Sequence, residues 1–369
     1  MPPSAKRPPY RAEHVGSLLR PPELRAAYKQ FADGALDQAG FHAVQDQAIR
    51  DVVALQENIG LEAVNDGEFR RISYWAHFVD GTNGLDVSEA RFDFHNDKGD
   101  STHFLSPLVT GPLSRAHPIS GGEFDFLNSV TTATPKVTLP SPPTMHFWTR
   151  KGAAVGAGYA NDGAFFAELA RIYREEIADL AARGAQYLQI DEVPLAMLCD
   201  PDLRERLKTD GEDPDALITA YVDLINHSIK DRPDDMAIAM HLCRGNFKGK
   251  WLSEGGYAYV AERLFNDIQV DGFFLEYDTP RAGDFTPLAA VPSNKVVVLG
   301  LVSSKTPVLE DKAALARRID EAAQYIPLDQ LALSPQCGFA STVAGNPVTQ
   351  DDEIAKLQLI VDTAREVWG

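Results

Sequence analysis

Two side chains at the end of one apolar segment are of types that bind transition metals. Residues 236–240 form an apolar run that continues into His241 and Cys243 and then reaches a turn at Gly245. This pattern predicts a buried strand that ends in a loop. Side chains two residues apart on a strand point to the same face, so an imidazole and a thiol would project together, and both are zinc ligands. Alone, such a pair is more often packing than metal binding.

Two later apolar runs end in side chains of the same chemical kind. Residues 273–275 lead to Glu276, and residues 331–335 lead to Cys337. If these segments are strands of one parallel sheet or barrel, their carboxyl ends lie at the same edge and the side chains can converge. The set then predicts Zn²⁺ as the cofactor, bound by two cysteines, one histidine and one glutamate.

Composition and charge restrict the class of protein. The chain has 369 residues, which suits one large α/β barrel or two domains. A net charge of −18 argues against nucleic acid or an anionic membrane as the main partner, and we interpret it as solubility. No apolar stretch of about 20 residues predicts a membrane span, and the first residues lack the apolar core of a signal peptide. Only three cysteines occur, Cys199, Cys243 and Cys337, so we expect no disulfide framework and a cytoplasmic location.

Apolar runs alternate with amphipathic segments along most of the chain. The expected strands are a short one after residue 12 and runs near 61–68, 136–143, 187–192, 236–243, 273–276, 295–302 and 331–337. The expected helices cover about 22–31, 36–59, 164–182, 213–229, 257–268, 313–325 and 352–367. This order predicts a (β/α)8 TIM barrel, whose chemistry lies at the carboxyl ends of the strands. A doubly wound sheet is the alternative, but it does not easily bring these strand ends to one point.

We expect a single barrel domain over residues 1–369, with two additions. Residues 1–12 are proline-rich and are expected to form an extended N-terminal arm. Residues 80–134 break the strand–helix rhythm after the second strand, with hairpin-like pieces at 92–104 and 121–126. We interpret this stretch as an insertion over the active face, since long loops of this kind are often lids. The alternative is a decorated surface loop.

Taken together, these segments resemble the catalytic barrel of cobalamin-independent methionine synthase, and most closely the short, single-barrel homologues of that family. The resemblance extends over most of the chain and consists of motifs that occur in the family's order. They are the loop at Gly16 and Ser17, residues 66–70, residues 141–148, residues 189–192, His241 with Cys243, Glu276 and Cys337.

The resemblance implies a role for each of these residues. It implies that His241, Cys243, Glu276 and Cys337 bind one zinc ion. It implies also that Ser17, Glu68 and Asp191 hold the amino-acid part of a thiol such as homocysteine. Opposite charge explains the second role, because carboxylates suit an ammonium group and a hydroxyl suits a carboxylate. The alternative for Glu68 and Asp191 is a structural ion pair with Arg70 or Arg71.

The sequence departs from the full-length enzymes in two respects. Those enzymes have an additional N-terminal barrel that helps to hold a polyglutamylated folate, and this chain has no room for it. The family also places a histidine proton donor just after the seventh strand, whereas Lys305 is the only ionisable group in residues 302–307. Lys305 could act as the proton donor or bind an anionic part of the substrate, or it could be a surface lysine. Trp148 falls where the family stacks its pteridine, and rim packing is the alternative.

The resemblance implies a zinc-dependent S-methyltransferase of methionine biosynthesis. The thiol, homocysteine by this interpretation, would be activated as a zinc thiolate and methylated by 5-methyltetrahydrofolate or a simpler methyl donor. Zinc-dependent alkyl transfer to another thiol, as in epoxide:coenzyme M transferases, is the first alternative. A zinc-binding structural or sensor protein and a metal-free tetrapyrrole decarboxylase barrel are the others. The expected partners are thus small molecules, with a second copy of the chain or an accessory protein left open.

Overall fold

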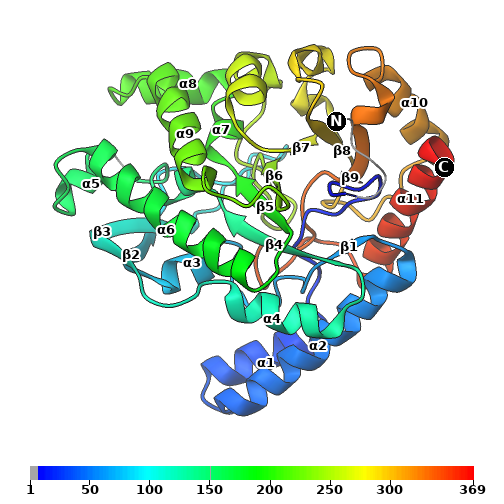
Figure 1. Ribbon diagram of the computed structural model, residues 1–369, viewed down its shortest axis with the longest axis horizontal. Coiled ribbons are helices and arrows are strands. Elements are labelled where there is room, and N and C mark those ends of the chain that lie inside the picture. The colour runs from blue at the N-terminus through cyan, green and yellow to red at the C-terminus, as the bar shows by residue number, and fades with distance from the viewer. Residues whose placement is uncertain (1–6, 150) are drawn as a thin grey trace.

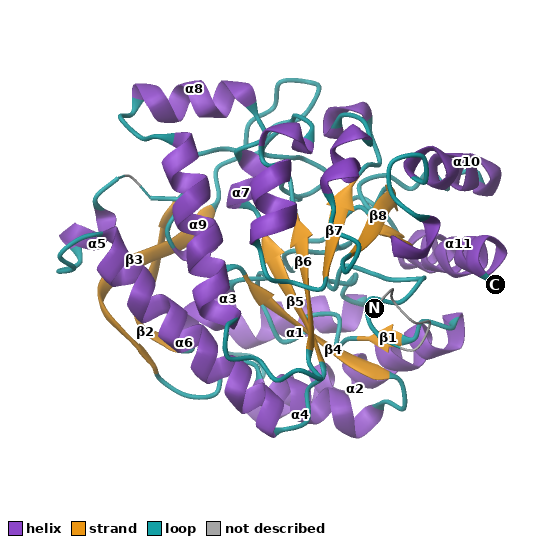
Figure 2. Ribbon diagram, turned by 45° about the horizontal axis from the view of Figure 1, so that its top comes forward, coloured by secondary structure: helices purple, strands orange, loops and turns teal. Residues whose placement is uncertain are grey.

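The computed structural model describes residues 7–149 and 151–369. Its main sheet has seven strands, all parallel and hydrogen-bonded to one another in chain order. They are β1 (Ala63–Val64), β4 (Thr134–Pro140), β5 (Tyr187–Glu192), β6 (Ala237–Leu242), β7 (Gly272–Glu276), β8 (Val296–Val302) and β9 (Leu331–Pro335). Every residue of β5 to β9 is buried, as expected for strands covered on both faces. The sheet curls, and the long helices lie outside it (Figures 1 and 2).

The first predicted strand is replaced by an irregular segment between the two edges of the sheet. Its only ladder contact among the described residues is a bridge from Ala12 to Leu333 of β9, and Leu333 N donates to Arg11 O at 2.9 Å. On the other side, Leu18 N donates to Gly67 O, just after β1, at 3.2 Å. The predicted α/β barrel class is therefore confirmed in a form with seven strands rather than eight. The turn at Gly16, with φ of 143°, interrupts the extended backbone that an eighth strand needs.

The helices follow the predicted amphipathic segments closely. They are α1 (Pro22–Ala32), α2 (Gln38–Ile59), α6 (Asp162–Ala182), α9 (Pro214–Ile229), α10 (Lys312–Ala322) and α11 (Gln350–Trp368). Three shorter helices were not predicted: α5 (Ala153–Gly156), α7 (Pro194–Met197) and α8 (Pro201–Thr209). The side chain of Asp37 caps α2, and Gly60 ends it in a left-handed conformation. No helix in the described part of the chain has the length and hydropathy to cross a membrane.

The predicted helix over residues 257–268 is the exception. It is divided into a 3₁₀ turn, η2 (Tyr257–Tyr259), and a π turn, η3 (Arg263–Asp267). The side-chain amide of Asn266 donates to Glu262 O at 3.0 Å. That carbonyl is the one to which the backbone N–H of Asn266 would bond in an α-helix, so the side chain competes with the helical pattern.

Residues 80–134 contain an antiparallel hairpin and a helix. The hairpin pairs β2 (Thr82–Glu89) with β3 (Leu105–Arg115), close to the short α3 (Ala76–Asp80), and a bridge from Phe94 to Thr102 extends it toward its tip. The predicted hairpin at 121–126 is wrong: the segment belongs to α4 (Gly121–Val130), whose Phe124 and Leu127 are buried three residues apart. In Figure 1 the hairpin lies beside α5 and α6.

The predicted N-terminal arm falls partly outside the described residues, because residues 1–6 are not described. Tyr10 is buried, and its hydroxyl lies 2.7 Å from Thr134 Oγ1 at the start of β4. The backbone N–H of Tyr10 also donates to Glu13 at 2.9 Å. The described end of this segment is therefore packed against the sheet.

Candidate metal centre and its cavity

The four predicted metal ligands come together at the carboxyl edge of the sheet. His241 is the second-last residue of β6, and Cys243 follows that strand. Glu276 ends β7, and Cys337 follows β9. One ligand atom from each residue lies within 4.8 Å of the others, and all four residues are buried. They meet because parallel strands that are adjacent or nearly adjacent end at the same edge of the sheet.

The chemistry of this set fits Zn²⁺. The sulfur atoms of Cys243 and Cys337 are 3.5 Å apart, and neither ring nitrogen of His241 has a hydrogen-bond partner among the described residues. A buried imidazole without a partner is costly, and a metal ion removes that cost. The hydrogen bond from Cys243 and the proximity of His241 hold the pKa of the Cys337 thiol well below its ordinary value. Two thiols, an imidazole and a carboxylate form a donor set that zinc prefers.

Glu276 is held from two sides. Its Oε1 accepts a hydrogen bond from the backbone N–H of Arg244 at 2.8 Å, and its Oε2 lies 3.9 Å from Nζ of Lys305. Burial raises the pKa of Glu276, and the charge of Lys305 opposes that change. Lys305 itself is buried but is not among the described residues that line the adjoining cavity. Its predicted role as a proton donor therefore stays a prediction.

A cavity of about 400 Å³ adjoins the metal ligands. His241, Cys243 and Cys337 contribute to its lining. The four residues predicted to bind substrate also line it: Ser17, Glu68, Trp148 and Asp191. The structure thus places the predicted substrate residues and three predicted metal ligands around one space.

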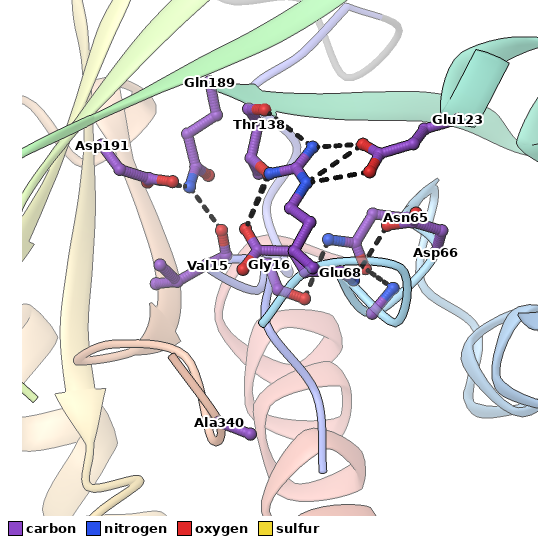
Figure 3. A network of polar contacts seen from close by, with 12 residues as sticks. Val15, Gly16, Asn65, Asp66, Glu68, Glu123, Thr138, Gln189, Asp191 and Ala340 are labelled. Atoms are coloured by element: carbon purple, nitrogen blue, oxygen red, sulfur yellow. Dashed lines mark hydrogen bonds and ion pairs between the residues drawn. The ribbon is translucent and has the colours of Figure 1, made fainter. Parts of the chain in front are cut away.

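Glu68 has one satisfied carboxylate oxygen and one free oxygen. Its backbone is left-handed, with φ of 59°, and its N–H donates to Asp66 Oδ1 at 2.9 Å. Thr138 Oγ1 donates to Glu68 Oε1 at 2.7 Å, and Arg71 Nη1 lies 3.5 Å from the same oxygen (Figure 3). Oε2 is buried without a partner in the described structure. The ion pair with Arg71 that was the alternative is present, but it leaves Oε2 available.

Asp191 is a second buried carboxylate at this cavity. It lies near the end of β5, and Gln189 Nε2 donates to its Oδ1 at 2.7 Å (Figure 3). Burial and the charge of Glu68 raise the pKa of Asp191 to about 7. A carboxylate whose ionisation is disfavoured by a neighbouring negative charge is stabilised in its ionised form by a cation bound beside it.

Ser17 has room beside the cavity because the residue packed against its side chain, Gly338, has no side chain of its own. A Cβ atom on Gly338 would lie 2.0 Å from Ser17 Oγ, and the two segments are joined by a hydrogen bond from Phe339 N to Ser17 O at 2.8 Å. Trp148, by contrast, is only 2% exposed and packs its ring 5.2 Å from that of Phe104. Both residues therefore occupy fixed positions in the lining.

Several residues that position the site were not assigned roles from the sequence. Thr138 and Arg71 orient Glu68, and Arg71 is held in turn by Glu123 at 2.6 Å. Gln189 orients Asp191. Gln189 could have been found, because it lies two residues before Asp191 and hence on the same face of a strand. The ion pair of Arg71 with Glu68 is local and was the alternative considered from the sequence. The contacts that Thr138 and Glu123 make with this pair come from distant segments and leave no local signal.

Comparisons with known proteins agree with this geometry. The family model described as the catalytic domain of cobalamin-independent synthase matches residues 11–366. The uncharacterized protein YxjH of Bacillus subtilis is 39% identical over 98% of this chain and 96% of its own length. The 5-methyltetrahydropteroyltriglutamate–homocysteine methyltransferase of Mycolicibacterium paratuberculosis is 26% identical over 98% of this chain but only 43% of its own length.

Solved structures show the same similarity. A Listeria monocytogenes protein assigned as a vitamin-B12-independent methionine synthase superposes with a TM-score of 0.77 and 31% identity. The superposition covers 99% of each chain.

Proposed function

Because the chain belongs to the family of the cobalamin-independent synthase catalytic domain, we propose that it is a zinc-dependent methyltransferase that methylates homocysteine to form methionine. The methyl donor is 5-methyltetrahydrofolate or a simpler methyl compound. One observation carries the proposal: three of the four clustered ligands line the same cavity as two buried carboxylates. The first group suits a thiol through the metal, and the second suits an ammonium group.

His241, Cys243, Glu276 and Cys337 would hold the metal. Bound zinc supplies one chemical effect, which is to keep a coordinated thiol deprotonated at neutral pH although the pKa of a free thiol is ~8.5. The backbone N–H of Arg244 fixes Glu276 within this set. Lys305 adds a positive charge beside the set, which otherwise carries three acidic side chains.

The protein's other residues would hold the amino-acid part of the substrate. Glu68 Oε2, which lacks a partner among the described residues, and Asp191 would accept hydrogen bonds from the ammonium group. Ser17 would donate to the carboxylate. Methyl transfer needs the sulfur to be aligned with the donor carbon, and fixing both ends of the amino acid supplies that alignment.

Coenzyme M is the main alternative thiol, and the two carboxylates support homocysteine over it. Its sulfonate is an anion and it has no ammonium group, so it would leave Glu68 and Asp191 without a partner. A structural zinc site is also disfavoured, because such sites are usually closed, whereas this one adjoins a cavity of about 400 Å³.

The test is zinc content followed by calorimetric titration of thiols into the zinc form. We expect stoichiometric zinc in the wild type and its loss in Cys337→Ser. Cys199→Ser is the matched control, because Cys199 is equally buried but is not part of the clustered set. We also expect homocysteine to bind with release of a proton and coenzyme M to bind more weakly.

Three results would contradict the proposal. Wild-type protein without zinc would remove the metal centre, and zinc without thiol binding would indicate a structural metal. A preference for coenzyme M would indicate alkyl transfer to that thiol instead.

A further inference from the structure

Part of the cavity lining is aromatic and comes from three separate segments. Four of the rings form a connected group: Phe94 and Phe104 of the 80–134 segment, Trp148 after η1 (Pro142–Met145), and Phe247 in the loop after β6. Phe94 lies 4.9 Å from Phe104 and 5.4 Å from Phe247, and Phe104 lies 5.2 Å from Trp148, measured between ring centroids. We call these four residues the aromatic box. A cluster of rings is a binding surface for organic cations, which interact favourably with the ring faces.

The described lining of the cavity offers no positive side chain to an anionic donor. That lining contains the carboxylates Glu68 and Asp191 and neither lysine nor arginine. A cation–π contact places Lys248 Nζ 5.2 Å from the ring centroid of Phe247 in the box, but Lys248 is exposed. Lys248 does not line the cavity. With Glu68 and Asp191 assigned to the ammonium group of the thiol, an anionic donor would face rings, and no positive side chain of the described lining would compensate its charge.

The acidic groups of the lining point to the same class of donor. A donor that is neutral at the reacting atom leaves as an anion unless a side chain protonates it. Glu68 and Asp191 are assigned to the ammonium group, and His241 and the two cysteines to the metal.

The remaining titratable groups of the described lining are His103 and Tyr74. The side chain of His103 is 81% exposed and its Nδ1 lies 2.5 Å from Asp93. Tyr74 carries a phenol, which is a weaker acid than an imidazolium or a carboxylic acid and is therefore a poor proton donor to a leaving group at neutral pH. A methyl donor that is already positively charged needs no such acid, because it leaves as a neutral molecule.

We propose that the aromatic box binds a small methyl onium ion, either a methylsulfonium or a quaternary methylammonium, as the methyl donor. The proposal rests on the proposed methylation of an amino-acid thiol. In the transfer, the bond between the methyl carbon and the onium atom breaks, and its electron pair stays on that atom, which departs neutral. The methyl carbon bonds to the substrate sulfur, and the thiol proton is released to solvent.

Cavity size restricts the donor to a small ion. The volume of about 400 Å³ is close to the ~300 Å³ at the small end of ligand pockets, and here it must contain both substrates. The volume of the cavity therefore favours a compact onium group over a donor with a long anionic tail.

The experiment is calorimetric titration of the zinc-loaded protein with trimethylsulfonium, tetramethylammonium and tert-butanol, a neutral compound of similar shape. The variants are Phe104→Leu and Phe247→Leu, whose side chains are only partly buried. The matched control is Phe31→Leu, which removes a 42% exposed ring on α1, outside the cavity. We expect either box substitution to weaken binding of the cations roughly 2- to 30-fold and to leave homocysteine binding unchanged. Phe31→Leu should change neither.

Methyl transfer from each of the two cations to homocysteine, followed by mass spectrometry of methionine, then identifies the onium source. The same assay with 5-methyltetrahydrofolate and the Lys248→Ala variant tests for an anionic donor. We expect Lys248→Ala to leave the onium reaction unimpaired. Methyl transfer only from 5-methyltetrahydrofolate, or equal binding of tert-butanol and the cations, would overturn the onium donor. That failure is distinct from failure of the proposed function, which would appear as absent homocysteine binding in the same zinc-loaded protein.

Discussion

Glu68→Gln tests the amino-acid half of the site with almost no change of shape. Glutamine retains an oxygen that can accept from Thr138 Oγ1, now 2.7 Å from Glu68 Oε1. It replaces the unpartnered Oε2 by an NH₂ group, which is a donor and cannot accept from an ammonium group. Arg71 keeps its ion pair with Glu123 at 2.6 Å, so we expect the fold to persist.

The expected loss follows from the bond that is removed. A hydrogen bond to a charged group contributes about 1.5–3 kcal/mol, which corresponds to a roughly 10- to 150-fold increase in Kd for homocysteine. The neighbouring carboxylate changes as well. Since the charge of Glu68 contributes to the raised pKa of Asp191, about 7 in the native protein, that pKa should fall in the variant. Asp191 then remains ionised at lower pH and recovers part of the affinity.

The assay compares two thiols that differ in one group. Homocysteine and 4-mercaptobutyrate share the thiol, the chain and the carboxylate, but the second lacks the amino group. We expect Glu68→Gln to weaken homocysteine and to leave 4-mercaptobutyrate unchanged in calorimetric titration. Glu192→Gln is the control, because Glu192 is a buried carboxylate on the same strand as Asp191 but outside the described lining. Equal weakening of both thiols, or of homocysteine by Glu192→Gln, would refute the ammonium assignment.

Three further predictions concern the site and the fold. Gly338→Ala places a methyl group 2.0 Å from Ser17 Oγ. We expect this substitution to lower the unfolding free energy by about 1–3 kcal/mol and to weaken homocysteine binding. The double variant Gly338→Ala with Ser17→Gly should recover part of the stability. Burial raises the pKa of Glu353 from 4.5 to about 8, so the folded state binds the proton more tightly and stability falls as pH rises between those values, by up to about 5 kcal/mol. Glu353→Gln should therefore raise the Tm at pH 8.5 but not at pH 4, and an equal change at both would contradict this. Removal of zinc by a chelator should lower the Tm of the wild type by roughly 5 °C or more and leave Cys337→Ser unchanged in differential scanning calorimetry.

The clustering of the four predicted metal ligands could be predicted from the sequence because topology alone brings these residues together. Each follows or ends an apolar run, and parallel strands carry such ends to one edge whatever the loops do. His241, Cys243, Glu276 and Cys337 therefore converge without knowledge of any loop.

The second expected strand shows where this reasoning stops. Residues 61–68 look like one strand, but β1 contains only Ala63 and Val64. The chain then turns with positive φ at Gly67 and Glu68, which a strand cannot accommodate. The sequence Asn65-Asp66-Gly67 is a turn signal, so the end of the strand could have been predicted at this point. The contact of Asn65 Nδ2 with Gly16 O at 2.8 Å, which secures the turn, joins segments 49 residues apart and could not.

The 80–134 segment contacts the loop after β6 through backbone hydrogen bonds as well as through aromatic rings. His95 N donates to Trp251 O at 2.9 Å, and Trp251 N donates to His95 O at 3.1 Å. Trp251 lies in the loop that begins at Cys243 and carries Phe247 of the aromatic box. One ring of the aromatic box, Phe247, and one predicted metal ligand, Cys243, thus lie in the same loop. The inserted segment is hydrogen-bonded to that loop. We therefore expect a change in the hairpin tip to alter the position of Phe247 relative to Cys243. If the proposed function holds, the insertion would then contribute to the alignment between the donor and the sulfur as well as cover the site.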